Sequence, residues 1–409
     1  MDCRRGGLRW IRQIGGILHR KDQDVYVRLQ RHLDRQPVGF PATPSGAELR
    51  ILRHIFTPEE AEIAACLSWR PEPVEIIYAR ARHLAASPEA LEAALQGIRH
   101  KGGLESTVKE DRTHYCNAPL VVGMYEMQLD RLTPEFVADF NAYTADRRFG
   151  IAFLGTALPQ MRTIPVGKSI HPRHHAATFD TVTTLLEQAE GPFLLLECIC
   201  RRKREMEGSP CRVTERKETC LAMGAIARSV LEGGTGREIT RREAMALIEE
   251  NQREGLVLQP SNTEKAEFIC SCCGCCCGML EMHRKLPRPL EYWAANFQAA
   301  VDPGRCNGCG KCERRCQVDA IQVLSPEGTA TVDLDRCIGC GVCVAVCPTE
   351  AAVLVKKPVE TRPPRTREEL NEILMARKQG GIDRLKLTGR LVLDAVRTGR
   401  TDLLKRLAR

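Results

Sequence analysis

Apolar positions recur at helical spacing in the first part of the chain, separated by polar positions. Two of the expected helices begin at recognisable caps. Thr57-Pro58-Glu59-Glu60 combines an N-cap, a proline at the first helical position and a Glu three residues after the cap, and Ser87-Pro88-Glu89 repeats the first two features. The last helix runs into Gly102-Gly103, which predicts its end. The apolar positions behind this pattern are Ile63, Leu67, Ile76, Ile77, Leu91, Leu95 and Ile98.

The hydrophobic period changes after these helices. Residues 104–124 hold two β-prone runs around a charged turn, which predicts a hairpin. Three helices followed by a hairpin resemble a winged-helix domain, and we assign residues 45–145 to it. Residues 1–44 are basic and then rich in Pro and Gly, so we expect an N-terminal arm and a linker there.

Strands and helices are mixed in the middle of the chain. A buried strand at 193–196 leads into Cys198-Ile199-Cys200, and Thr240-Arg241-Arg242-Glu243 is a capping box that opens a helix ending near Gly255. Further strands are expected at 255–258 and 266–269. We therefore predict a mixed α/β domain over residues 146–290, called the Cys-rich domain below.

Cysteine content changes this picture more than any other feature of the composition. The chain is 43% hydrophobic and 27% charged, as in ordinary soluble proteins, but it holds 21 cysteines. Most of them lie in Cys-x-x-Cys or adjacent-Cys runs, which suit metal ligation better than disulfides. Four arginines interrupt any signal-peptide core in the first 12 residues, and no stretch approaches the about 20 apolar residues of a membrane span. We expect a cytoplasmic protein, at most peripheral at the inner membrane surface.

A self-repeat at an offset of 31 residues is the strongest signal, with residues 301–320 matching 332–351. Each half carries Cys-x-x-Cys-x-x-Cys-x-x-x-Cys. A cubane iron–sulfur cluster needs four thiolates, and three from one tight loop leave one corner to be filled from elsewhere. Zinc needs only four ligands in all and no third cysteine in each run, so the spacing favours two [4Fe–4S] clusters. The eight cysteines are Cys306, Cys309, Cys312, Cys316, Cys337, Cys340, Cys343 and Cys347.

These residues resemble the bacterial ferredoxins with two [4Fe–4S] clusters, over residues 291–356, called the ferredoxin module below. In that family the last cysteine of each run ligates the opposite cluster. Pro348 follows Cys347 as in the family, but Gln317 takes the corresponding place after Cys316, where we expect a local loosening. The resemblance implies one cluster held by Cys306, Cys309, Cys312 and Cys347, and another held by Cys337, Cys340, Cys343 and Cys316.

Ten further cysteines match no small-ferredoxin spacing. Cys198 and Cys200 are expected to point to one face of a strand, and the strand leading to Cys270 to lie beside it. An additional iron–sulfur cluster, a zinc site and a redox-active thiol set all remain open, because ligand softness does not separate iron–sulfur from zinc. The candidate ligands are Cys198, Cys200, Cys211, Cys220, Cys270, Cys272, Cys273, Cys275, Cys276 and Cys277.

The order of the segments over about 45–356 is similar to that of uncharacterised iron–sulfur proteins of anaerobic bacteria. These combine a winged-helix-like region, a Cys-x-Cys-Arg segment, a Cys-Cys-x-Cys-Cys-Cys segment and a two-cluster ferredoxin module. The resemblance implies anaerobic metabolism. It indicates the order of the domains but says little about the reaction. The fold class that we predict is α+β with several domains.

Residues 357–409 read as a basic, amphipathic helical tail. From Lys356 to Arg409 there are 15 Lys and Arg against 7 Asp and Glu, which accounts for the whole net charge of +8. Such a tail can contact an acidic redox partner, lie on an anionic membrane surface, or pack as a solvated helix.

The leading hypothesis is an electron-transfer protein or oxidoreductase subunit that passes single electrons to partner proteins. One alternative is a redox-sensing regulator that binds DNA through the winged helix. The predicted third helix, however, carries basic residues only at its end, in Arg99-His100-Lys101, which disfavours DNA. Another alternative is an oxidoreductase with a catalytic metal site at the middle cysteines. No catalytic acid or base can be named.

Overall fold

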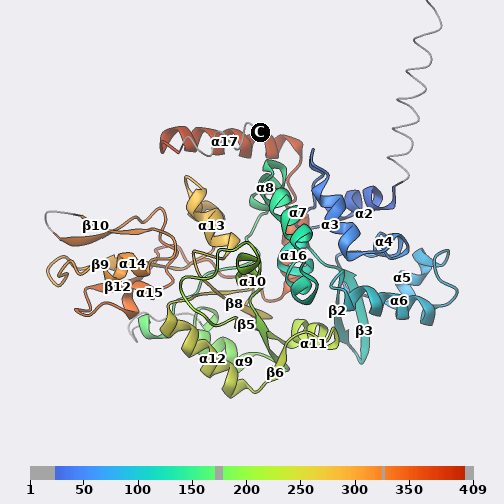
Figure 1. Cartoon of the computed structure of the whole chain (residues 1–409), viewed down its shortest axis with the longest axis horizontal. Helices are drawn as coiled ribbons and strands as arrows, with labels where there is room; N and C mark the ends of the chain where they lie inside the picture. The colour runs from blue at the N-terminus through green and yellow to red at the C-terminus, as the bar shows by residue number, and fades with distance from the viewer. Residues whose placement is uncertain (1–23, 171–177, 325–327, 401–409) are drawn as a thin grey trace, which may run out of the picture. The chain divides into compact units, whose positions relative to one another are not determined.

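The computed structural model describes residues 24–170, 178–324 and 328–400 (Figure 1). The chain forms two compact units of mixed helices and small sheets. The first holds the described residues up to Met127 together with Thr133–Phe153, and the second holds Gln128–Leu132 and everything from Leu154 onward. Among the described helices, none is both long enough and apolar enough to cross a membrane.

The first unit contains the predicted helices and hairpin. Thr57 and Glu60 form the expected capping box, and the Ser87 side chain accepts a hydrogen bond from the Ala90 amide. Its three strands are antiparallel in the order β1-β3-β2. The winged-helix assignment stays a prediction. The elements are α2 (Val25–Asp34), α3 (Ala47–Ile55), α4 (Pro58–Ala64), β1 (Glu72–Pro73), α5 (Val74–Ala81), α6 (Pro88–His100), β2 (Leu104–Lys109), β3 (Arg112–Asn117), α7 (Pro134–Ala145) and α8 (Arg147–Leu154).

Helix α2 corrects the expectation of an arm and linker over residues 1–44. Tyr26, Leu29 and Leu33 recur at helical spacing and are buried, and the Tyr26 hydroxyl donates to the Phe56 carbonyl at 3.0 Å. Charged residues between these apolar positions hide the helical pattern in the sequence. Residues 1–23 lie outside the described part of the chain.

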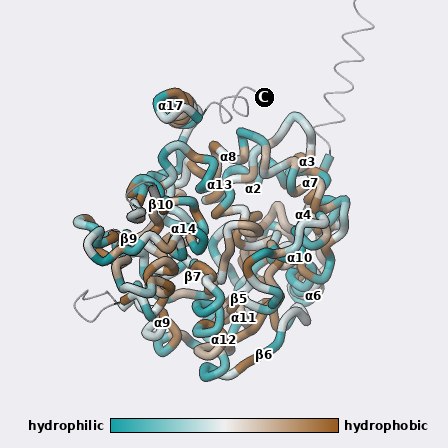
Figure 2. The backbone as a smooth tube through the Cα atoms, turned by 60° about the vertical axis from the view of Figure 1, so that its left-hand side comes forward, coloured by the Kyte–Doolittle hydropathy of each residue, from teal (hydrophilic) through white to brown (hydrophobic). Residues whose placement is uncertain are grey.

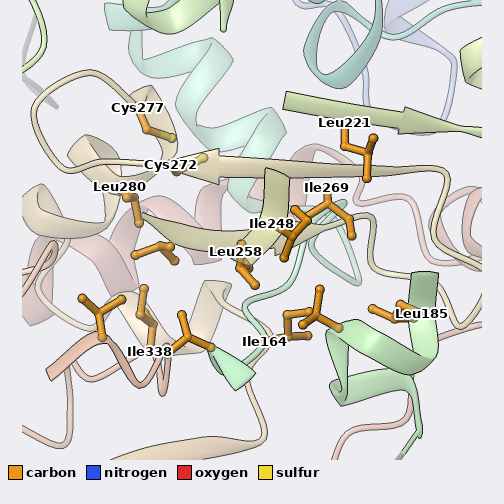
Figure 3. Packing of buried hydrophobic residues seen from close by; sticks show 14 of the residues in the cluster. Ile164, Leu185, Leu221, Ile248, Leu258, Ile269, Cys272, Cys277, Leu280 and Ile338 are labelled. Carbon is orange, nitrogen blue, oxygen red and sulfur yellow. The ribbon is translucent and has the colours of Figure 1, made fainter. Parts of the chain in front are cut away.

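A five-stranded antiparallel sheet lies within the residues predicted as the Cys-rich domain, in the order β6-β4-β5-β8-β7. Leu221, Ile248, Leu258 and Ile269 meet in its core (Figure 3). The predicted capping box at Thr240 and Glu243 begins α12, and Gly255 ends it in a left-handed conformation with φ of 84°. The elements are α9 (Val182–Gln188), β4 (Phe193–Glu197), α10 (Ile199–Met206), β5 (Glu218–Met223), α11 (Gly224–Glu232), β6 (Arg237–Ile239), α12 (Arg241–Glu254), β7 (Val257–Pro260), β8 (Phe268–Cys272) and α13 (Gly278–Lys285).

Each half of the sequence repeat forms a strand, a short helix and a second strand, yet the sheets combine the two halves. Strand β9 of the first half pairs with β12 of the second, and β10 pairs with β11. The two cysteine loops are thereby brought together. The elements are β9 (Phe297–Val301), α14 (Lys311–Arg315), β10 (Ile321–Leu324), β11 (Thr329–Val332), α15 (Val342–Ala345) and β12 (Ala352–Lys356).

Two helices follow the ferredoxin module, as predicted for the tail: α16 (Arg367–Ala376) and α17 (Gly381–Arg397). Leu387 and Leu391 on one side of α17 are buried, whereas Leu385 and Val396 are 74% and 60% exposed. Hydrophobic and hydrophilic positions alternate around this helix (Figure 2). Helix α17 therefore buries one apolar face and leaves a second one open. The end of the predicted tail, residues 401–409, lies outside the described residues.

Candidate metal centres

The first thiol set consists of the cysteines that the ferredoxin resemblance assigns to one cluster. The thiols of this set come from both halves of the repeat. They line a single pocket together with Pro348. Cys309 is exposed, and the other three are half-buried. The pairing of β9 with β12 positions Cys347 across from the first loop. The set is Cys306, Cys309, Cys312 and Cys347.

The second thiol set lies deeper. Cys337 and Cys343 are buried in the hydrophobic core of the second unit, and burial raises the pKa of Cys343. Burial, reinforced by the negative charges of Cys316 and Cys337, raises the pKa of Cys340 to about 12. Such thiols stay protonated at neutral pH unless a cation replaces the proton. The set is Cys316, Cys337, Cys340 and Cys343.

Backbone amides donate hydrogen bonds to the first and the last cysteine sulfur of each run. The Ala330 amide donates to Cys306 Sγ at 3.4 Å, and the Ala299 amide donates to Cys337 Sγ at 3.3 Å. Burial raises the pKa of Cys347, but amide donors, that of Ala352 first, outweigh it and lower the pKa below the usual value. Amide donors of this kind stabilise the negative charge of thiolates and iron–sulfur clusters.

Two glycines allow the halves to approach closely. Gly308 and Gly339 have φ of +66° and +64°. A Cβ at Gly308 would lie 2.0 Å from the Gly328 carbonyl oxygen, and one at Gly339 would lie 2.1 Å from the Phe297 carbonyl oxygen. Only glycine allows both the positive φ and the close approach of the carbonyl oxygen. The two halves of the repeat therefore have glycine at the same position of the loop.

Four cysteines of the Cys-rich domain form a compact group, called the tetrad. Their sulfur atoms all lie within 4.8 Å of one another, and within the described residues no other such group occurs. Cys211 Sγ is 3.6 Å from Cys273 Sγ and 3.7 Å from Cys275 Sγ. Thiolates around one tetrahedral ion with metal–sulfur bonds of about 2.3 Å lie about 3.8 Å apart, so the spacing fits a single ion such as zinc. A cubane separates its thiolates further, because each binds a different iron. The tetrad is Cys211, Cys273, Cys275 and Cys276.

The other six middle cysteines lie in a second group, called the hexad. Two expectations about it are wrong. Cys198 and Cys200 do not lie on a strand, because β4 ends at Glu197 and Cys198 is the N-cap of α10. Strand β8 also does not lie beside β4, because β5 separates them. The hexad is Cys198, Cys200, Cys220, Cys270, Cys272 and Cys277.

Arg201, which the sequence analysis did not single out, lies buried between tetrad and hexad. Its guanidinium donates to the Thr219 hydroxyl, to the Ser271 carbonyl at 3.1 Å and to Cys273 Sγ at 3.8 Å. Burial lowers the pKa of Arg201, but the negative charges of nearby thiols, that of Cys198 first, outweigh it and raise the pKa. The residue belongs to a basic run, and the sequence carries no signal that distinguishes this arginine from its exposed neighbour Arg202.

Gln317 connects the ferredoxin module to the tetrad loop. Its side-chain oxygen accepts a hydrogen bond from the Gly274 amide at 2.7 Å, and a Cβ at Gly274 would lie 2.5 Å from the Gln317 carbonyl oxygen. The expected loosening at this position is wrong. Gln317 is 8% exposed and holds the turn after Cys316 against the loop between Cys273 and Cys275.

Comparison with known proteins identifies one segment. Residues 288–351 match the family model of the 4Fe-4S dicluster domain. No curated protein and no solved structure matches the chain. With the Cys groups described above, the match supports iron–sulfur electron transfer and metal binding. The segment 288–351 is thus a ferredoxin-like domain that binds 4Fe–4S clusters.

Proposed function

We propose that the protein carries single electrons between a partner at its surface and the Cys-rich domain, through two [4Fe–4S] clusters held by the first and second thiol sets. The observation that carries the proposal is the difference in burial between the sets. Cys309 of the first set is exposed, whereas Cys337 and Cys343 of the second set are buried. A partner can therefore approach the first cluster, and the second cluster faces the protein interior.

The second thiol set packs, through the hydrophobic core, toward the cysteines of the Cys-rich domain. Ile338, next to Cys337, belongs to the same hydrophobic core as Leu280, Cys272 and Cys277 (Figure 3). The Gln317–Gly274 hydrogen bond links the residue after Cys316 to the tetrad loop. These contacts favour a redox role for the middle thiols, as in an oxidoreductase, over a regulator that acts through the first unit.

Anaerobic reductive titration of the full chain tests this function. We expect about eight iron atoms in the ferredoxin module and, on reduction, the EPR spectrum of two interacting clusters that accept one electron each. The reduced protein should return these electrons to a one-electron dye. A single isolated cluster signal with about four iron atoms, or clusters that cannot be reduced and reoxidised, would contradict the proposal.

For the tail we propose attachment to an anionic membrane surface through the open face of α17. Leu385 and Val396 on this face are exposed, and Lys386 and Arg397 provide positive charges on the same helix. Exposed apolar side chains next to basic ones are typical of helices that lie on membranes.

The substitution Leu385→Ser/Val396→Ser should abolish sedimentation with anionic vesicles, and Lys386→Gln/Arg397→Gln should weaken it mainly at low salt. The control is Arg237→Gln, at an exposed position of β6 in the Cys-rich domain. If the unsubstituted protein does not sediment with the vesicles, the membrane proposal fails, and contact with an acidic partner protein becomes the alternative.

A further inference from the structure

Strand register gathers three of the hexad thiols on one face of the central sheet. Strands β5 and β8 pair Leu221 with Ile269 and Ala222 with Phe268. The next step of the same register places Cys220 opposite Cys270. Cys272 lies two residues further along β8 and therefore on the same face as Cys270.

Two helix starts supply the other three thiols. Cys198 is the N-cap of α10, Cys200 lies in the first turn of that helix, and Cys277 is the N-cap of α13. Cys272 and Cys277 lie side by side where β8 leads into α13 (Figure 3). The thiols interact electrostatically across these elements: Cys198 with Cys200 and Cys220, Cys277 with Cys200 and Cys272, and Cys270 with Cys220 and Cys272.

The surroundings of the hexad suit thiolates. Cys198, Cys272 and Cys277 are at most 7% exposed. Cys198 and Cys277 are the N-cap residues of α10 and α13, where the unpaired amides of a helix favour negative charge. Six thiolates without cations would carry a prohibitive charge in such a buried place, and the single positive charge of Arg201 cannot balance it.

The number and arrangement of the thiols exclude a single tetrahedral ion. Such an ion takes four ligands, and a cubane also takes four, one for each iron. The tetrad sulfurs all lie within 4.8 Å of one another, whereas among the described residues no three hexad sulfurs lie that close together. We propose that the hexad is a metal site separate from the tetrad, and that it holds a polynuclear centre of soft metal ions with bridging thiolate or sulfide. This site does not depend on the electron-transfer proposal.

Metal analysis of the anaerobically purified full chain tests the hexad. Iron, zinc and acid-labile sulfide are measured for the unsubstituted protein, for Cys220→Ala/Cys270→Ala in the hexad, for Cys275→Ala in the tetrad, and for Cys66→Ala as a control. Cys66 is a half-buried thiol of the first unit. We expect the hexad variant to lose about two metal ions or more and to keep the tetrad ion and the iron of the ferredoxin module. The tetrad variant should lose about one ion, and the control none.

The chemistry of the lost metal identifies the centre. Loss of iron together with sulfide indicates an iron–sulfur cluster, and loss of zinc without sulfide indicates a zinc–thiolate cluster; both support the proposal. Equal losses in the tetrad and hexad variants would show one shared site and overturn it. If the hexad variant does not fold, alkylation of the unsubstituted protein with and without a chelator tests whether the hexad thiols bind metal. A metal site predicts that the hexad thiols react with the alkylating agent only after a chelator has removed the metal. If chelator treatment does not increase their alkylation, or if they form disulfides with one another, the metal site is refuted.

Discussion

Cys347→Ser is expected to destroy the cluster held by Cys306, Cys309 and Cys312, and to leave intact the cluster that is nearer in sequence. The reason is that Cys347 lines the pocket of the first thiol set, while β12 pairs with β9 across the repeat. Iron in the ferredoxin module should fall from about eight to about four atoms. Electron exchange with an external partner should be lost with it, because the first set contains the exposed Cys309.

Alkylation followed by mass spectrometry shows which cluster is lost. In Cys347→Ser the freed thiols of Cys306, Cys309 and Cys312 should react with the alkylating agent, and Cys337, Cys340 and Cys343 should stay protected. The matched variant Cys316→Ser should give the reverse pattern. Labelling of Cys340 and Cys343 in Cys347→Ser would mean that each run of four cysteines holds its own cluster.

Arg201→Met should empty both the tetrad and the hexad of metal. Arg201 is 4% exposed, its guanidinium contacts Cys273, and its charge acts on Cys198 and Cys220. Methionine preserves much of the side-chain volume but removes the cation, so the thiolates of both groups lose their common counter-charge. Removing one partner of a buried charge pair costs about 3–5 kcal/mol.

The neighbouring Arg202→Met is the control, because Arg202 is 45% exposed and lies 3.9 Å from Glu197 and 3.8 Å from Glu205. Its loss should cost less than about 1 kcal/mol. Metal content and the midpoint of anaerobic urea unfolding are compared for both variants, with the iron of the ferredoxin module as an internal reference. Equal metal content in the two variants would show that Arg201 does not support the thiol groups.

The parts of the site that follow from local spacing could be predicted from the sequence. The repeat around Cys306 and Cys337 identifies all eight thiols of the module. The division of the ten middle cysteines into the tetrad and the hexad could not be predicted from local spacing. It depends on the pairing of β5 with β8, which joins Cys220 to Cys270 over a long separation in sequence.

Other features depend on burial, which the sequence does not display. Arg201 reads as one member of a basic run, yet it is buried while Arg202 is half-exposed. Gln317 reads as a departure from the ferredoxin pattern, and only the packed structure shows that it binds the Gly274 amide. Helix α2 was overlooked because its apolar positions are spaced among many charges.

Residues 270–277 supply cysteines to both thiol groups, which has a consequence for how the protein matures in the cell. Cys272 belongs to the hexad and the adjacent Cys273 to the tetrad. In the same way, Cys276 belongs to the tetrad and the adjacent Cys277 to the hexad. Metal delivery to either group therefore immobilises the backbone that the other group needs, and the second loading step loses less conformational entropy. Loading of one group should consequently speed the loading of the other, while each group still holds its own metal ions when the other cannot form.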